Sequence, residues 1–126
     1  MSAARLAAAY FGAQGVAVAA WWVFLWAVPA TRGFFLPSGE LTRAFLAFAL
    51  PDVVVLGGGS VAAGVLIARA DGRARVTLWV VVGALAYATL YTLAWWILTG
   101  APVLSVALMV LALLGSTIGA RRALQA

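Results

Sequence analysis

The feature that most constrains this chain is the stretch from Val76 to Ala120, which contains no charged residue. A helix needs about 20 apolar residues to cross a bilayer, so this stretch is too long for one crossing. The segment Thr99-Gly100-Ala101-Pro102 divides it, because glycine and proline favour turns. The pattern therefore predicts a hairpin of two membrane-spanning helices, at about 76–98 and 103–120.

Two further apolar runs precede this hairpin. The first, Leu6–Val28, is longer than the 7–15 residues of a signal-peptide core, so we interpret it as a span of about 6–28. The second, about 44–68, contains Pro51 and several glycines, which membrane helices tolerate where neighbouring helices satisfy the freed backbone groups. We therefore expect a single transmembrane domain over residues 1–126. Its predicted fold is an all-α, antiparallel, up-down four-helix bundle.

The composition agrees with a membrane protein and excludes several kinds of chemistry. Hydrophobic residues make up 67% of the chain and charged residues only 9%, whereas a soluble domain carries about 25% charged residues. Without cysteine or histidine, the chain has no thiolate chemistry, no histidine-ligated haem and none of the usual zinc sites. Its carboxylates, Glu40, Asp52 and Asp71, are too few for a carboxylate metal cage. We expect no cofactor and no metal.

The basic residues predict the orientation in the membrane. All eight are arginines at the ends of apolar runs, and they divide unequally between the two sides of the predicted bundle. One side holds six: Arg5, Arg69, Arg73, Arg75, Arg121 and Arg122; the other holds Arg32 and Arg43. The positive-inside rule predicts that both termini are cytoplasmic. Arginines beside spans also attract anionic lipid headgroups, so we expect membrane lipids, and no nucleic acid, as partners. The expected location is the plasma (inner) membrane of a prokaryote.

Asp52 is the one ionisable residue within an apolar run. At 1.5 Å per residue, it lies about 12 Å from the outer end of the second predicted span. A charge at that depth costs at least about 2–3 kcal/mol, so its side chain should face the bundle interior or a wet cavity. Tyrosines and tryptophans of the neighbouring spans fall in the same outer half. We therefore predict a ligand pocket formed by Asp52, Tyr87, Tyr91 and one or both of Trp22 and Trp26.

A structural role for Asp52 is the alternative. Proline kinks helices, and an aspartate after Pro51 could cap the helical segment that restarts there. Other polar and small residues have structural interpretations too: Gln14 is predicted to form an interhelical hydrogen bond. Small residues spaced by four positions allow close helix contact, and they predict packing sites at Gly12, Ser60, Gly64, Gly115 and Gly119.

Three functions are consistent with these features. The first is an accessory or scaffold subunit, with other membrane subunits or a second copy as partners, which the lack of a catalytic constellation favours. The second is a lipid-, sterol- or isoprenoid-binding protein, or an isomerase-like enzyme that uses Asp52 as its acid–base group. The third is a small proton- or cation-coupled transporter. We expect assembly or ligand binding rather than catalysis.

This chain resembles two families of membrane proteins that carry acidic residues within their helices. The segment Phe48-Ala-Leu-Pro-Asp52, after a loop that contains Glu40, is similar to the second helix of the emopamil-binding/sigma-2 receptor superfamily. The resemblance implies a four-helix core with membrane-embedded acids in a sterol-sized pocket. The acids of that family's first helix have no counterpart in Leu6–Val28. The four spans and the length also resemble the small multidrug resistance transporters, whose essential acid likewise lies in the first helix.

Overall fold

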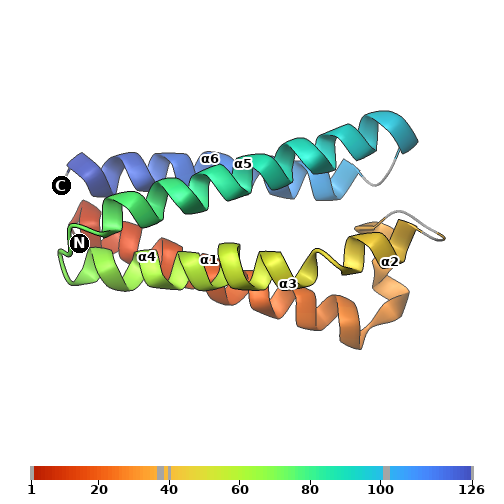
Figure 1. Ribbon diagram of the computed structural model, residues 1–126, viewed down its shortest axis with the longest axis horizontal. Coiled ribbons are helices and arrows are strands. Elements are labelled where there is room, and N and C mark those ends of the chain that lie inside the picture. Colours follow the sequence, from red (N-terminus) through yellow and green to blue (C-terminus); the bar gives the residue numbers. More distant parts are fainter. Residues whose placement is uncertain (1, 37–38, 40, 101–102, 126) are drawn as a thin grey trace.

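The computed structural model describes residues 2–36, 39, 41–100 and 103–125. Within these residues, four helices are long and apolar enough to cross a membrane: Ala3–Ala27, Thr42–Ala68, Ala74–Thr99 and Val103–Gln125. They pack antiparallel, and Figure 1 shows both termini at the end of the bundle that holds the connection between α4 and α5. The predicted all-α, four-span membrane fold is confirmed. Ala101 and Pro102, in the predicted division of the hairpin, lie outside the described residues.

The helical elements follow one another with short connections. In chain order they are α1 (Ala3–Ala27), the 3₁₀ helix η1 (Pro29–Phe34), α2 (Leu41–Leu46), α3 (Ala49–Pro51), the π-helix η2 (Asp52–Gly58), α4 (Gly59–Ala68), α5 (Ala74–Thr99) and α6 (Val103–Gln125).

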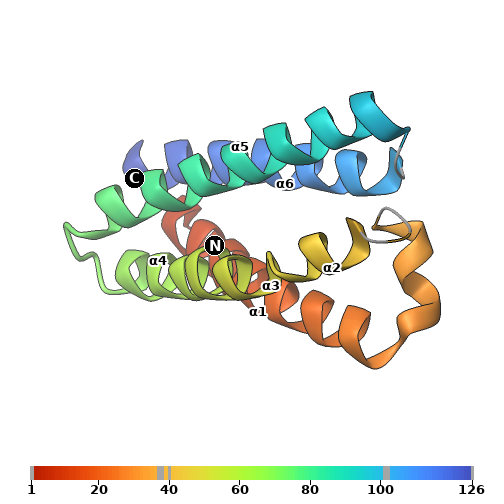
Figure 2. The same ribbon diagram turned by 45° about the vertical axis from the view of Figure 1, so that its right-hand side comes forward.

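The helices form two layers, with α1 and α4 in one and α5 and α6 in the other (Figures 1 and 2). The main apolar core lies between the layers in the half of the bundle near the termini. Its fully buried members include Phe11, Ala63, Leu78, Val81 and Ala120. A second cluster, formed by Trp22, Leu25 and Leu36, lies in the opposite half.

The second span is not a continuous α-helix. Its first segment ends at Leu46, a turn covers Ala47 and Phe48, and the helix resumes at Ala49. Pro51 has no N–H to donate to the carbonyl of Ala47, four residues earlier, so the helix is interrupted one turn before the proline. The π-helix η2 then begins directly at Asp52. Such π segments are rare and are frequently found at functional sites.

Glycines allow the close approach of α1 to the second span. A Cβ atom on Gly15 would lie 2.5 Å from the carbonyl oxygen of Gly57. A Cβ atom on Gly64 would lie 2.8 Å from the carbonyl oxygen of Ala8 and 3.0 Å from the amide nitrogen of Gly12. All three distances are below van der Waals contact, so this crossing requires residues without a side chain at positions 15 and 64.

Glycines of α6 receive two aromatic rings of α1. A Cβ atom on Gly115 would lie 2.5 Å from the hydroxyl oxygen of Tyr10, and one on Gly119 would lie 3.3 Å from the ring of Phe11. Ser60 has a different role, because its side chain is fully buried and hydrogen-bonded to Gln14. The predicted positions 60, 64, 115 and 119 thus lie at helix–helix contacts on two sides of α1, whereas a Cβ atom on Gly12 would meet nothing within 4 Å.

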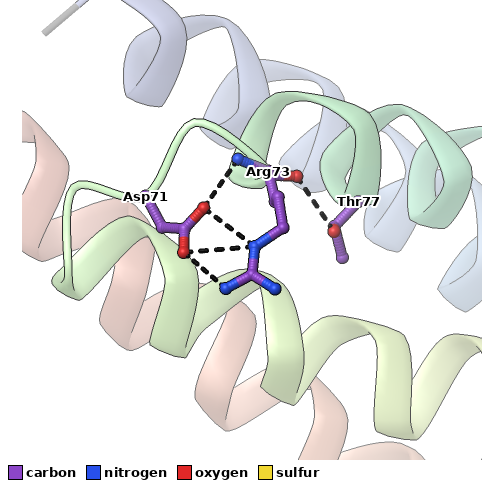
Figure 3. A network of polar contacts seen from close by, with 3 residues as sticks. All are labelled: Asp71, Arg73 and Thr77. Carbon is purple, nitrogen blue, oxygen red and sulfur yellow. Dashed lines mark hydrogen bonds and ion pairs between the residues drawn. The ribbon is translucent and has the colours of Figure 1, made fainter.

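Hydrogen bonds hold the turn between α4 and α5 (Figure 3). Ala70 adopts a left-handed conformation with a φ of 52°. The Asp71 carboxylate accepts hydrogen bonds from the backbone N–H of Arg73 at 2.9 Å and from its Nη2 at 2.8 Å. The side-chain bonds from Arg73, followed by the backbone bond, lower the pKa of Asp71 from 3.8 to about 2. This network fixes the start of α5.

Candidate ligand-binding cavity

A cavity of about 320 Å³ lies between the two helical layers, in the half of the bundle away from the termini. Side chains from α1, α5, α6, the first half of the second span and the segment after η1 form its wall. The wall is largely apolar, and its aromatic members among the described residues are Trp21, Trp22, Phe35, Phe45, Phe48 and Tyr91. The volume is within the range of small-molecule pockets, which run from about 300 to 1,000 Å³.

Asp52 lines this cavity from the first position of η2. It is half-buried, and its Oδ2 accepts a hydrogen bond from the indole Nε1 of Trp22 at 3.2 Å. Among the described residues, no other side chain and no backbone N–H donates to this carboxylate. The bond links α1 to the second span, so Asp52 joins two helices while it faces the cavity.

Of the two predicted tyrosines, the cavity includes only Tyr91. Its ring centroid lies 4.7 Å from that of Phe48 and 5.8 Å from that of Phe45. Tyr87, one turn away on α5, stacks on Tyr91 with a centroid distance of 6.4 Å. Its side chain is 65% exposed and is not part of the cavity wall. Tyr91 therefore provides the aromatic face from α5.

Trp26 also lies outside the cavity. It is 57% exposed and contacts Arg32, whose guanidinium carbon lies 6.0 Å from the ring centroid. It lines an apolar groove of about 720 Å³ on the outer surface between α1 and the second span. Trp22 lines both this groove and the cavity. The structure thus brings together Asp52, Tyr91 and Trp22, but not Tyr87 or Trp26.

Other polar side chains of the cavity wall have partners within the protein. Gln14 donates to Ser60 Oγ at 3.0 Å, and its Oε1 accepts a hydrogen bond from Ser116 at 2.7 Å. These bonds confirm the predicted interhelical role of Gln14. Thr92 donates to a carbonyl of its own helix at 2.8 Å, and Ser105 donates to the backbone carbonyl of Phe35.

The predicted pocket did not include the aromatic residues of the second span, Phe45 and Phe48. Phe45 and Phe48 lie one turn apart, and Phe48 in turn precedes Asp52 by four residues. Helical residues three or four apart share a face, so this spacing indicates that both rings lie on the same side of the helix as Asp52. Trp21 was also missed; it packs against Phe35 with a centroid distance of 4.4 Å, and both rings line the cavity.

The cavity wall is chemically simple. Its described residues include one carboxylate, and no group of three or more His, Cys, Asp or Glu side chains gathers anywhere in the described part of the chain. Glu40, the other acid in the family resemblance, lies outside that part. Comparisons with protein-family models, curated proteins and solved structures found no match. Function must therefore be inferred from the cavity itself.

Proposed function

We propose that this protein binds a small, largely apolar molecule in the cavity between its four helices. The observation that carries the proposal is a cavity of about 320 Å³ with an aromatic wall, in which Asp52 is the single acid among the described residues. Small-molecule sites are typically lined by apolar and aromatic side chains with a few polar groups that orient the ligand. Protein interiors are otherwise closely packed, and a void of this size forgoes many van der Waals contacts that a ligand would restore.

The ligand belongs to the lipid, sterol or isoprenoid type, or to other molecules that dissolve in the bilayer. We also propose that the arginine-rich end of the bundle, which holds both termini, faces the cytoplasm. The cavity would then lie in the outer half of the membrane. This orientation fits the inner membrane of a prokaryote, where the surrounding lipid is the nearest source of such a ligand.

Binding is better supported than catalysis or transport. General acid–base chemistry needs a group that is positioned beside the reacting atom and matched in pKa, often with a second group that completes the proton transfer. Apart from Asp52, the described residues of the cavity wall include no acid, arginine, lysine or histidine. Within the described part of the wall, Tyr91 is the only other ionisable group. An isomerase-like reaction or proton-coupled transport would therefore depend almost entirely on one carboxylate.

A matched pair of variants on α5 tests the proposal. Ala88 lines the cavity, whereas Ala94 is exposed on the outer surface of the same helix. Ala88→Phe should fill the cavity, and Ala94→Phe should leave it open. We expect native mass spectrometry of gently extracted protein to detect a bound small molecule on the wild type and on Ala94→Phe, and to find none on Ala88→Phe.

Two results would contradict the proposal. One is a bare chain in all three samples, and the other is a small molecule that Ala88→Phe retains fully. A second protein chain bound in fixed proportion to a wild type with an empty cavity would favour the accessory-subunit function instead. A helical circular dichroism spectrum for each variant shows that the bundle is intact.

A further inference from the structure

The hydrogen-bonding capacity of the cavity identifies what a ligand must supply. Gln14, Thr92 and Ser105 each donate a hydrogen bond to another group of the protein, and Gln14 also accepts one. Asp52 uses one oxygen, Oδ2, to accept from Trp22, and Oδ1 accepts from no described residue. The Tyr91 hydroxyl also has no partner among the described residues, and it can donate or accept. The neutral side chains of the wall keep some N–H groups and hydroxyl oxygens, but among its described residues Asp52 Oδ1 is the unoccupied carboxylate acceptor.

In its ionised form this acceptor carries a charge that no described residue of the cavity wall balances. None of the described residues that line the cavity is basic. Within the described part of the chain, the single ion pair joins Arg73 to Asp71 in the turn between α4 and α5, at the other end of the bundle. An ionised carboxylate without a cation is costly in an apolar surrounding, because the charge is neither solvated nor paired. A ligand that brings a positive charge removes this cost.

The aromatic wall favours the same charge. The rings of Phe48 and Tyr91 lie 4.7 Å apart, and the backbone N–H of Asp52 donates to the carbonyl of Phe48, one helical turn before it. Trp22, which donates to Asp52, adds an indole to the wall. Aromatic faces attract cations, and the attraction is larger where water is excluded. A cation at Asp52 would therefore meet a carboxylate and aromatic rings together.

We propose that the ligand of this cavity carries a protonated amine that donates an N–H to Asp52 Oδ1, and that its apolar body packs against Phe48, Tyr91 and Trp22. This inference rests on the proposed function, since it names the chemical class of the molecule that the cavity binds. A neutral lipid alcohol would donate a hydrogen bond but would leave the charge unpaired. A quaternary ammonium would pair the charge but has no N–H to donate.

Two probes with the same apolar cage separate these possibilities: aminoadamantane, which is protonated at neutral pH, and adamantanol. Their binding is measured by equilibrium dialysis against the protein in phosphatidylcholine nanodiscs, with empty nanodiscs subtracted. Because the amine both donates to the carboxylate and pairs its charge, whereas the alcohol only donates, the amine should bind about tenfold more tightly than the alcohol. Asp52→Asn should abolish this preference, because the amide has no charge to pair, and adamantanol that still binds to this variant shows that the cavity is intact.

Asp71→Asn is the matched control, because it removes the same charge outside the cavity and should keep the preference for the amine. Equal binding of the two probes by the wild type would overturn the amine class and leave the proposed function standing. A preference that persists in Asp52→Asn would also overturn it. Binding of neither probe would overturn both proposals.

A third probe keeps the inference testable if Asp52→Asn loses its helicity. Trimethyladamantylammonium retains the positive charge but has no N–H. We expect the wild type to bind it more weakly than aminoadamantane. Equal or tighter binding would overturn donation from an N–H to Asp52.

Discussion

Trp22 donates a hydrogen bond to Asp52 across 3.2 Å, and this bond ties α1 to the π-helical turn of the second span. The indole is 7% exposed and lines both the cavity and the apolar groove on the outer surface. Its ring therefore stands between the two spaces, and the bond to Asp52 holds it there. The same pair of residues serves the packing of the helices and the wall of the proposed binding site.

Trp22→Phe should destabilise the bundle by about 0.5–2 kcal/mol. The substitution keeps an aromatic ring in the wall but removes the donor to Asp52, and interhelical hydrogen bonds in membrane proteins have values at the lower end of this range. Unfolding in mixed micelles, followed by circular dichroism, measures the effect.

Trp26→Phe is the control for this substitution. Trp26 lines the outer groove but not the cavity, and the indole that donates to Asp52 is that of Trp22. Its replacement should change the free energy of unfolding less than that of Trp22 does. Equal losses from the two variants would mean that the bond between Trp22 and Asp52 contributes nothing measurable.

The distribution of charged residues along the sequence predicted the four spans, because a long uncharged apolar run is typical of a membrane helix. The cavity was predicted only in part. Counting residues inward placed Asp52, Trp22 and Tyr91 at similar depths, but depth does not fix the direction in which a side chain points. Tyr87 shows this limit: it lies one turn from Tyr91 and is nevertheless 65% exposed. Trp26, one turn beyond Trp22, faces the outer groove.

Contacts between helices were harder to predict than contacts along one helix. The four-residue spacing of small residues indicated Gly64, but it gave no reason to choose Gly15 or Gly57. Their contact depends on which helices are neighbours and where they cross, and neither is encoded in local spacing. The break in the second span lies at Ala47 and Phe48 and not at Pro51 itself. The reason is local, because a proline leaves the carbonyl four residues before it without a hydrogen-bond donor.

Gly15→Ala should destabilise the bundle by about 1–3 kcal/mol, the usual cost of overpacking a close contact. The new Cβ atom would lie 2.5 Å from the carbonyl oxygen of Gly57 and 2.6 Å from Cγ2 of Val61, so the two helices would have to separate. Gly12→Ala on the same helix is the control, because its Cβ atom would meet nothing within 4 Å. It should be neutral or slightly stabilising, since alanine favours the helix. Similar losses for both variants would contradict the close crossing at Gly15.

Ala70→Gly should stabilise the protein, by up to about 1 kcal/mol. Ala70 has a φ of 52°, and the left-handed conformation costs a residue with a Cβ atom about 1–2 kcal/mol, which the greater chain entropy of unfolded glycine partly offsets. Ala68→Gly, at the end of α4, is the control and should destabilise, because that position is helical. Thermal unfolding of both variants measures the difference. A loss of stability in Ala70→Gly would contradict the left-handed turn.

The hydrogen bonds between Asp71 and Arg73 predict that the stability of the protein depends on pH in the acidic range. Hydrogen bonds from the Arg73 side chain and backbone lower the pKa of Asp71 in the folded protein to about 2, from an ordinary value of 3.8. The ionised form is therefore favoured by folding, and its contribution is complete above the ordinary pKa and lost as the pH falls through the folded one. Asp71→Asn should be less stable than the wild type at neutral pH, and this difference should shrink as the pH falls from 3.8 to about 2.

The comparison of wild type with variant isolates Asp71, because other acids titrate equally in both proteins. Arg73→Gln should also lower stability at neutral pH, since it removes the guanidinium donors that favour the ionised carboxylate. It should also raise the pH at which the contribution of ionised Asp71 is lost, toward the ordinary pKa of an aspartate. Unfolding in mixed micelles at a series of pH values measures both effects. A constant difference between wild type and Asp71→Asn down to the lowest pH would mean that folding does not favour the ionised carboxylate. The turn would then be held by its backbone alone.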